Sequence, residues 1–150
     1  MIKIRKAIED DLSQIFEIEK EATSPPWAYE AFLGELRRKD SFFIVVVDDT
    51  AEGCVIGYAI IRQVGDDKEL LKIAVKKSVR GNGIGDMLMS TVLDHAEENT
   101  HKAIFLEVRV GNIAATRLYE KYGFKSVRIR KDYYNNPYED AIVMVRGDMW

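Results

Sequence analysis

The chain has 150 residues, of which 47% are hydrophobic, and its formal net charge at pH 7 is −3. This size allows one domain, residues 1–150, with a sizeable core, and it leaves no room for a second domain. Lysine and arginine are scattered singly or in short groups. Because the basic stripe of a nucleic-acid-binding protein is missing, nucleic acid is not an expected partner.

The N-terminal residues, Met1 to Arg5, alternate like a strand and do not resemble a signal segment, and no apolar run is long enough to cross a bilayer. We therefore expect a cytoplasmic protein without a membrane partner. The single cysteine, Cys54, excludes an internal disulfide, and its place at an apolar run favours a buried structural thiol over a nucleophile. No His or Cys cluster has metal-ligand spacing, so no metal is expected.

The first half of the chain predicts an edge strand, two helices and a three-stranded antiparallel meander. After the strand Ile2 to Lys6, Asp10 or Asp11 is expected to cap a helix that Ser24 to Pro26 ends. A second short helix carries Trp27, Phe32, Leu33 and Leu36. The meander strands are expected at Phe42 to Val47, Cys54 to Arg62 and Glu69 to Val75, because apolar runs alternate there with short polar turns.

The stretch Val79 to Asp86 is typical of a phosphate-binding loop. Its glycines, Gly81, Gly83 and Gly85, leave no side chains between the backbone and a ligand, so successive N–H groups can face one anion. The amphipathic segment that follows supplies a helix N-terminus, whose unpaired N–H groups suit a diphosphate. A glycine-rich turn that only starts a helix is the alternative interpretation.

Two other phosphate loops do not fit these residues. A nucleoside-triphosphate loop needs Lys followed by Ser or Thr where Asp86 and Met87 stand. A dinucleotide fingerprint needs a third glycine at position 86 and a strand that ends at the first glycine. The remaining pattern, Arg-x-x-Gly-x-Gly over Arg80 to Gly85, resembles the pyrophosphate-binding loop of the GNAT superfamily of acetyl-CoA-dependent N-acetyltransferases.

The second half of the chain predicts strand, helix and a final hairpin. Ala103 to Val110 is an expected strand, followed by a helix that Asn112 caps and Gly123 ends. Strand, helix, strand and helix in succession imply one parallel crossover in an otherwise antiparallel sheet. The closing hairpin strands are expected at Phe124 to Arg130 and Ala141 to Arg146, around the segment Tyr133 to Tyr138.

Two side chains in this half are candidates for chemistry. Alternation places Phe105, Glu107 and Arg109 on one face of their strand. A carboxylate such as Glu107 in an apolar strand is desolvated unless it faces a cleft, and desolvation favours a general base. A salt bridge to a basic neighbour is the alternative. Tyr119 lies on the buried helix face, where it could pack in the core or send its hydroxyl into the same cleft.

The joint spacing of these motifs over nearly the whole chain is similar to that of the ribosomal-protein alanine N-acetyltransferase (RimI) group of protein N-terminal acetyltransferases. The matching segments are Pro26-Trp27, Leu70 to Val75, Arg80 to Gly85, Leu106 to Arg109, Asn112, Ala115, Leu118 to Glu120, Gly123-Phe124, Tyr133-Tyr134 and Glu139 to Ala141. The resemblance implies an α/β (α+β) GNAT fold. In that fold a mixed, mostly antiparallel, twisted sheet of about seven strands carries about four helices and is splayed at the acetyl-CoA site.

The resemblance also implies how acetyl-CoA, the cosubstrate, is held. Backbone groups of the strand that matches Ile73, Ala74 and Val75 pair with the pantetheine arm, and an N–H there polarises the thioester carbonyl. The implied pyrophosphate site consists of Arg80, Gly81, Asn82, Gly83, Ile84, Gly85 and the N–H of Asp86. Asn112 matches a cofactor-binding asparagine, and Tyr119 lies beside the thiol.

The same resemblance implies the catalytic roles. Glu107 matches the residue that deprotonates the incoming ammonium through water, and Tyr119 matches the acid that protonates the CoA thiolate. The acceptor is expected between Tyr133 and Tyr134 on one wall and Trp27 and Tyr29 on the other. Two departures from the family pattern stand out: Gly111 replaces a usual Ser, and Asp86 replaces a frequent basic residue.

The expected reaction is direct transfer of acetyl to the N-terminal α-amine of a protein or peptide in a ternary complex, with a ribosomal protein among the candidate acceptors. Acetylation of a small amine, such as a polyamine or an aminoglycoside, is the first alternative. A non-catalytic acyl-CoA-binding sensor is the second, if Glu107 is locked in a salt bridge. Monomer and homodimer are both open.

Overall fold

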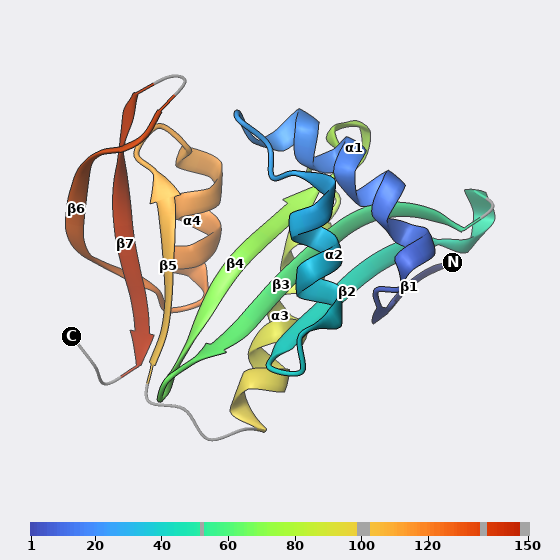
Figure 1. The fold of residues 1–150 in the computed structure, drawn as a ribbon, viewed down its shortest axis with the longest axis horizontal. Coiled ribbons are helices and arrows are strands. Elements are labelled where there is room, and N and C mark those ends of the chain that lie inside the picture. Colours follow the sequence, from blue (N-terminus) through green and yellow to red (C-terminus); the bar gives the residue numbers. More distant parts are fainter. Residues whose placement is uncertain (52, 99–102, 136–137, 148–150) are drawn as a thin grey trace.

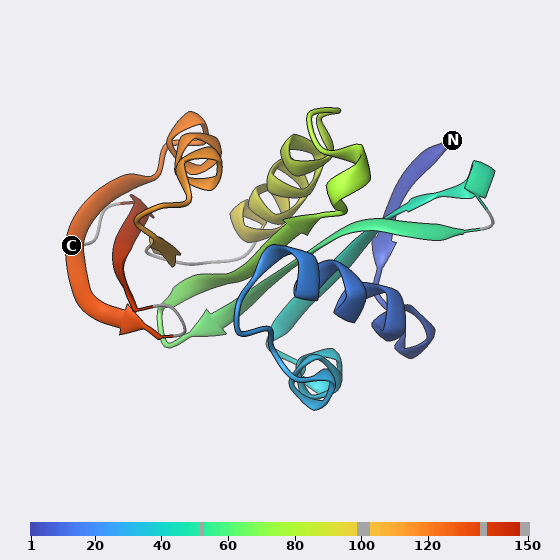
Figure 2. The same ribbon diagram turned by 90° about the horizontal axis from the view of Figure 1, so that it is seen from above.

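A computed structural model describes residues 1–51, 53–98, 103–135 and 138–147. These residues form one mixed sheet of seven strands with the order β1-β2-β3-β4-β5-β7-β6, and α1 and α2 cover one face while α3 and α4 cover the other (Figures 1 and 2). The strands are Ile2–Lys6 (β1), Ser41–Asp48 (β2), Cys54–Val64 (β3), Asp67–Val75 (β4), Ala103–Arg109 (β5), Lys125–Tyr134 (β6) and Glu139–Gly147 (β7). The helices are Leu12–Ala22 (α1), Tyr29–Arg37 (α2), Ile84–Glu97 (α3) and Ile113–Lys121 (α4). The expected fold class is confirmed.

Two apolar cores lie on opposite faces of the sheet. In β2, Phe43, Val45 and Val47 enter the core under α1 and α2, while Ile44 and Val46 enter the core under α3. The strand is buried from Phe43 to Val47 because helices cover both of its faces. This arrangement explains why its sequence is continuously apolar rather than alternating.

The strand order confirms the predicted topology, including β1 at one edge and the meander β2-β3-β4. The parallel pairing of β4 with β5 is the predicted crossover, and all other strand pairs among the described residues are antiparallel. The final hairpin differs from the expectation. Its strands extend further, so that Tyr134 pairs with Glu139, and Tyr133 and Tyr134 belong to β6 rather than to the turn. Residues 136–137 of the expected turn lie outside the described part of the chain.

The parallel pair β4–β5 is short, and this opens the sheet. Its register covers only Lys68 with Ile104 and Glu69 with Phe105. Immediately beyond, the β3–β4 register shifts by one residue, which leaves Leu71 as an extra residue in β4. A bulge of this kind bends a strand and increases its twist. From that point β4 and β5 diverge in a V that is visible in Figure 1.

Asp11 occupies the N-cap position of α1, which agrees with the prediction that Asp10 or Asp11 begins this helix, but its side chain makes no capping hydrogen bond there. The buried carboxylate of Asp11 instead accepts the Ile8 N–H at 2.8 Å and two N–H groups of Arg5 at 2.7 and 2.9 Å. Burial opposes ionisation, but Arg5 and the Ile8 N–H outweigh it and lower the pKa of Asp11. Asp11 thus fastens β1 to the start of α1.

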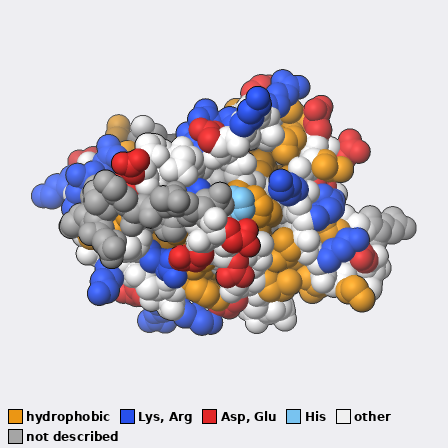
Figure 3. All heavy atoms as spheres, turned by 90° about the horizontal axis from the view of Figure 1, so that it is seen from below, with side chains coloured by type: hydrophobic (Ala, Val, Ile, Leu, Met, Phe, Trp, Pro, Cys, Tyr) orange, Lys and Arg blue, Asp and Glu red, His pale blue; other side chains and the backbone are white. Residues whose placement is uncertain are grey.

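No helix among the described residues is long and apolar enough to cross a membrane. On the face seen from below, basic, acidic and apolar side chains are interspersed (Figure 3).

Candidate active site

The predicted phosphate-binding loop leads directly into α3. Gly81 and Gly83 have φ angles of +82° and +80°, a left-handed conformation that favours glycine. A Cβ atom at either position would meet no other atom within 4 Å, so both face open space. The side chains of Arg80 and Asn82 turn back and donate to the carbonyls of Val75 (3.1 Å) and Val79 (2.8 Å). Side-chain hydrogen bonds therefore hold one side of the loop, while the backbone at Gly81 and Gly83 is uncovered on the other side.

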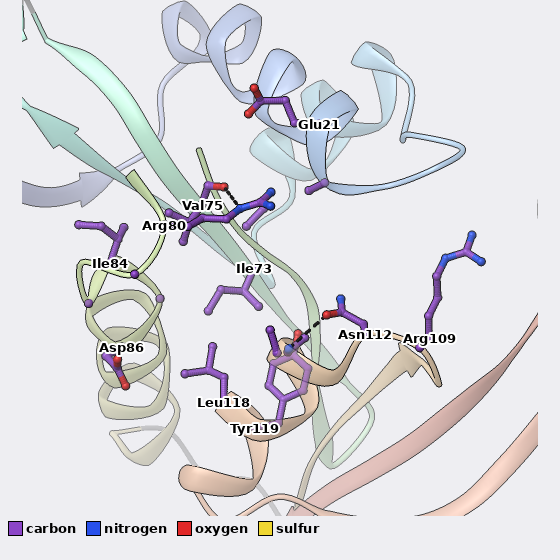
Figure 4. Close-up of a pocket in the computed structure, with 18 of the residues that line it drawn as sticks. Glu21, Ile73, Val75, Arg80, Ile84, Asp86, Arg109, Asn112, Leu118 and Tyr119 are labelled. Carbon is purple, nitrogen blue, oxygen red and sulfur yellow. Dashed lines mark hydrogen bonds between the residues drawn. The ribbon is translucent and has the colours of Figure 1, made fainter. Parts of the chain in front are cut away.

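A cavity of about 740 Å³ opens between this loop, the end of β4 and the start of α4 (Figure 4); we refer to it as the loop cavity. The predicted cofactor residues that line it are Ile73, Ala74, Val75, Arg80, Gly81, Gly83, Ile84, Gly85, Asp86, Asn112 and Tyr119. Asn82 is not among its lining residues. The backbone edge of β4 from Leu70 to Val75 that faces β5 has no strand partner in the described part of the chain, because the β4–β5 ladder ends at Glu69. Backbone donors and acceptors are therefore available along one wall.

A second cavity of about 350 Å³, the acidic cavity, lies on the opposite face of the sheet, on the side of α1 and α2. Glu107, Tyr133, Tyr134 and Trp27, four of the predicted site residues, line it. The two cavities share Ala22, Ile73, Arg109, Asn112 and Tyr119. The structure thus brings the bare glycine loop and the strand carboxylate to opposite sides of one junction.

Glu107 occupies the position that alternation predicted and also makes the predicted alternative contact. Its carboxylate accepts from Nη1 of Arg130 at 3.2 and 3.1 Å. The Glu107 side chain is 16% exposed, whereas that of Arg130 is 43% exposed and lies 4.1 Å above the ring of Tyr133. An ion pair with one partner this accessible contributes little to the free energy of folding, so little free energy is needed to break it. Glu107 is therefore paired and still faces the cavity.

Tyr119 is buried at the junction of the cavities. Its ring packs edge-on against Phe124, with 6.0 Å between the centroids. Burial, with a smaller contribution from Tyr134, raises the pKa of the Tyr119 hydroxyl, so the phenol stays protonated at neutral pH. Asn112 caps α4, as predicted, by accepting the Ala115 N–H at 3.2 Å, and this fixes the helix that carries Tyr119.

Glu69 was missed by the sequence reasoning. It lines the acidic cavity with Glu107, and burial, followed by the charge of Glu107, raises its pKa. The same environment raises the pKa of Tyr134 to about 12. The only signal in the sequence is a carboxylate at the start of an apolar strand, which is an ordinary position for a solvated residue. Its importance follows from the parallel register that brings β4 beside β5.

Trp27 is held by a buried charge cluster. The Glu19 carboxylate, 0% exposed, accepts from the Trp27 N–H (3.0 Å), the Tyr58 hydroxyl (2.6 Å) and Nζ of Lys72 (2.7 Å). Lys72 Nζ also lies 4.8 Å from the centroid of the Trp27 ring. The other predicted residue of this wall, Tyr29, packs against the core under α1 and α2 and does not line either cavity.

The two departures from the family pattern have specific partners. Asp86 accepts from Nζ of Lys121 (2.7 Å) and from the Tyr122 hydroxyl (2.9 Å), and these hydrogen bonds lower its pKa. Its negative charge is therefore matched by a cation from α4. The Gly111 N–H donates to Oε2 of Glu139 at 2.5 Å, and a Cβ at position 111 would lie 2.7 Å from that oxygen.

Two other side chains with reactive groups, His95 and Cys54, do not line either cavity. His95 stacks on Phe42 with 3.7 Å between the ring centroids, while His101 is outside the described residues. Cys54 is half-buried rather than buried as expected, because it begins β3 at one end of the sheet. Within the described ranges, no group of three or more His, Cys, Asp or Glu side chains is placed to hold a metal ion.

Comparison with known proteins agrees with this geometry. The family model described as the acetyltransferase (GNAT) family matches residues 5–124. A [ribosomal protein bS18]-alanine N-acetyltransferase of Salmonella typhimurium is 34% identical over 136 residues, covering 89% of each protein. The crystal structure of the ribosomal-protein-S18-alanine N-acetyltransferase from Escherichia coli superposes with a TM-score of 0.87 at 29% identity, covering 100% of this chain and 97% of that one.

A structure of Arabidopsis thaliana NAA60 in complex with acetyl-CoA has the same fold, with a TM-score of 0.85 at 20% identity, and the match covers 97% of each chain. Fold, loop and sequence similarity agree over most of the chain. The chain therefore belongs to the GNAT acetyltransferase family.

Proposed function

We propose that this protein transfers an acetyl group from acetyl-CoA to the N-terminal α-amine of a protein or peptide, by direct attack in a ternary complex. One observation carries the proposal: the loop cavity and the acidic cavity meet at Tyr119 and Asn112. The Salmonella relative is named for an alanine of ribosomal protein bS18. A ribosomal protein N-terminus in the cytoplasm is accordingly the acceptor that we propose.

The loop cavity fits acetyl-CoA by its chemistry. Bare backbone at Gly81 and Gly83 and the N-terminus of α3 suit the negative charge of a diphosphate. The open edge of β4, at Ile73 to Val75, offers N–H and C=O groups to an amide-containing arm. When bound, acetyl-CoA supplies an activated thioester. A backbone N–H of β4 would donate to the thioester oxygen as negative charge develops on it.

The acidic cavity suits an ammonium acceptor. An α-ammonium has a reference pKa of about 7.7 to 8.0, so most of it must lose a proton before the nitrogen can attack. In our proposal Glu107 takes that proton, directly or through one water molecule, while its exposed partner Arg130 swings aside. Glu69 adds a second negative charge that draws the cation in, and Trp27 and Tyr134 border its path.

Tyr119 has the properties of the proton donor for the departing thiolate. Burial raises the pKa of its hydroxyl, which stays neutral at working pH, and Tyr119 is one of the residues that line both cavities. In our proposal, donation of its proton prevents the thiolate from returning to the acetyl group. No covalent enzyme intermediate is needed, so the protein contributes mainly positioning and proton transfer.

The test is acetyl transfer to a panel of peptides with free or blocked N-termini, followed by mass spectrometry and thiol release. We expect acetylation of free N-termini, and a loss of kcat/KM of about 10²-fold or more for Glu107→Gln and Tyr119→Phe. Glu30→Gln, an exposed carboxylate on α2, is the matched control and should behave like the wild type. Acetylation restricted to lysines of blocked peptides would refute the proposal.

The Glu107–Arg130 ion pair is the observation that favours the sensor alternative. The same assay separates the two, because a sensor binds CoA but releases no thiol with any amine. In that case Arg130→Met, which frees Glu107, would also leave the protein inactive. Acetylation of polyamines or aminoglycosides in place of peptides would identify a small-amine acetyltransferase.

A further inference from the structure

Arg109 reaches across the opening of the V. It ends β5 two positions after Glu107 and lines both cavities. Figure 4 shows its side chain extending from β5 towards the segment that follows α1. There Nη2 donates to the backbone carbonyl of Ser24 at 2.5 Å, a contact between residues 85 positions apart. Arg109 thus links the end of β5 to the segment that follows α1.

The same guanidinium also contacts the hairpin formed by β6 and β7. Its Nη1 lies 3.3 Å from Oε1 of Glu139, and its carbon lies 4.3 Å above the Tyr134 ring. The second oxygen of Glu139 accepts the Gly111 N–H at 2.5 Å. The side chains of Arg109 and Glu139 are 20% and 26% exposed, so this network is shielded from most solvent competition.

These contacts lie between the two walls of the acidic cavity. Trp27 is carried by the segment after α1, and Tyr134 by the hairpin, on opposite sides of the V. The β4–β5 ladder ends at Glu69 and Phe105, so strand pairing does not hold the walls together at this end. Arg109 bonds the backbone beside one wall and stacks on the other. Only a planar, forked cation can make both contacts at once.

We propose that Arg109 is a positioning residue that holds the two walls of the acidic cavity at a fixed separation, next to the junction with the loop cavity. This inference rests on the proposed function for the identity of the acceptor. It goes beyond that function by assigning acceptor affinity to a residue that takes no part in proton transfer. Because the walls contact the acceptor and not the phosphate loop, loss of Arg109 should weaken peptide binding selectively.

The test compares Arg109→Met and Arg109→Lys with the wild type in peptide acetylation. For both variants we expect KM for the peptide to rise about tenfold or more, kcat to change less than about threefold, and KM for acetyl-CoA to stay within about twofold. Lys should fail to rescue, because it keeps the charge facing Glu139 but loses the fork. Arg38→Met, which removes an exposed arginine paired with Asp40, is the control and should leave every constant unchanged.

A second measurement does not depend on activity. Amide hydrogen exchange in residues 23–28 should be faster in Arg109→Met than in the wild type, while exchange within α3 is unchanged. Unchanged exchange in residues 23–28, or equal losses for both substrates, would overturn the inference. If the wild type ignores peptides, the proposed function fails, and the exchange experiment still decides whether Arg109 holds the two walls.

Discussion

At the scale of single residues, the acidic cavity has two carboxylates with different environments. Glu107 has a nearby cation, Arg130, at 3.1 Å. Glu69 lies on the neighbouring strand, where burial and the charge of Glu107 raise its pKa. Two negative charges placed together cost folding free energy, and a site that must bind a cation can tolerate that cost. Glu69 is therefore the residue where stability and acceptor binding should oppose each other.

We predict that Glu69→Gln stabilises the protein and weakens acceptor binding. Because folding raises the pKa of Glu69, its ionised form destabilises the native state above the pKa of the unfolded chain, about 4.3, and this cost disappears below that pH. Thermal unfolding at pH 7 should show a higher Tm for the variant, where about 1 kcal/mol would give about 2–4 °C. The difference should vanish near pH 3.5.

The same variant should have a severalfold higher KM for the peptide, since one of two attracting charges is gone. A Tm at pH 7 below that of the wild type would contradict the assignment of Glu69 as a half-buried carboxylate whose pKa is raised on folding. Residue-scale prediction from the sequence succeeded where a local pattern carried the information. Alternation predicted the face of β5 on which Glu107 lies and left a cleft and a salt bridge open, whereas Glu69 could be found only through the β4–β5 register.

At the scale of elements, α3 packs closely on β3 through Gly57. A Cβ at this position would lie 3.1 Å from Ile84, 3.2 Å from the carbonyl oxygen of Ala74 and 3.2 Å from Leu88. Ile84 is the first residue of α3 and directly follows the glycine loop, while Ala74 belongs to the open edge of β4. The glycine therefore sets how closely the phosphate-binding helix terminus approaches the strand that borders the loop cavity.

We predict that Gly57→Ala destabilises the protein by about 1–3 kcal/mol, because the added methyl group meets a backbone carbonyl that cannot move freely. Displacement of the start of α3 should also raise KM for acetyl-CoA. Chemical denaturation and steady-state kinetics check both effects. Gly34→Ala, in the exposed middle of α2 with nothing within 4 Å, is the matched control and should stabilise by about 0.5–1 kcal/mol.

Equal effects of the two glycine substitutions would show that space around Gly57 is not limiting.

Element bounds followed from the sequence wherever apolar periodicity and a clear stop coincide, as in α4 with its Asn112 cap and Gly123 end. The partner of the Asp11 side chain at the N-cap of α1 did not follow from the sequence, because its carboxylate binds Arg5 of β1, a residue that local capping rules do not consider.

At the scale of the whole molecule, the sheet has two groups of strands that are joined side by side over only two residue pairs, Lys68–Ile104 and Glu69–Phe105. Figure 2 shows α3 on one group and α4 on the other, on the same face of the sheet. Asp86 of α3 reaches Lys121 of α4, and Arg109 reaches Ser24 on the other side. A ligand in the loop cavity would contact both groups of strands.

We predict that acetyl-CoA and CoA stabilise the folded protein by binding both groups of strands. At 100 times Kd the stabilisation is about 2.7 kcal/mol, which in a chain of this size corresponds to a Tm rise of roughly 5–10 °C. Differential scanning fluorimetry over a CoA series checks this. Gly83→Ala, which strains the left-handed residue before α3, should require more CoA for the same rise. A Tm that is independent of CoA at millimolar concentration would refute the assignment of the loop cavity.

The sequence by itself determined the order of strands and helices, the bare loop before α3, and the side of the strand on which Glu107 lies, because each depends on spacing within a short segment. Only the tertiary structure decided how far β4 and β5 pair, which acidic side chains share a cavity, and that Arg109 spans to Ser24. Those features join residues that are far apart in the chain. Strand register and the packing of helices on both sheet faces bring them together, and local patterns do not encode either.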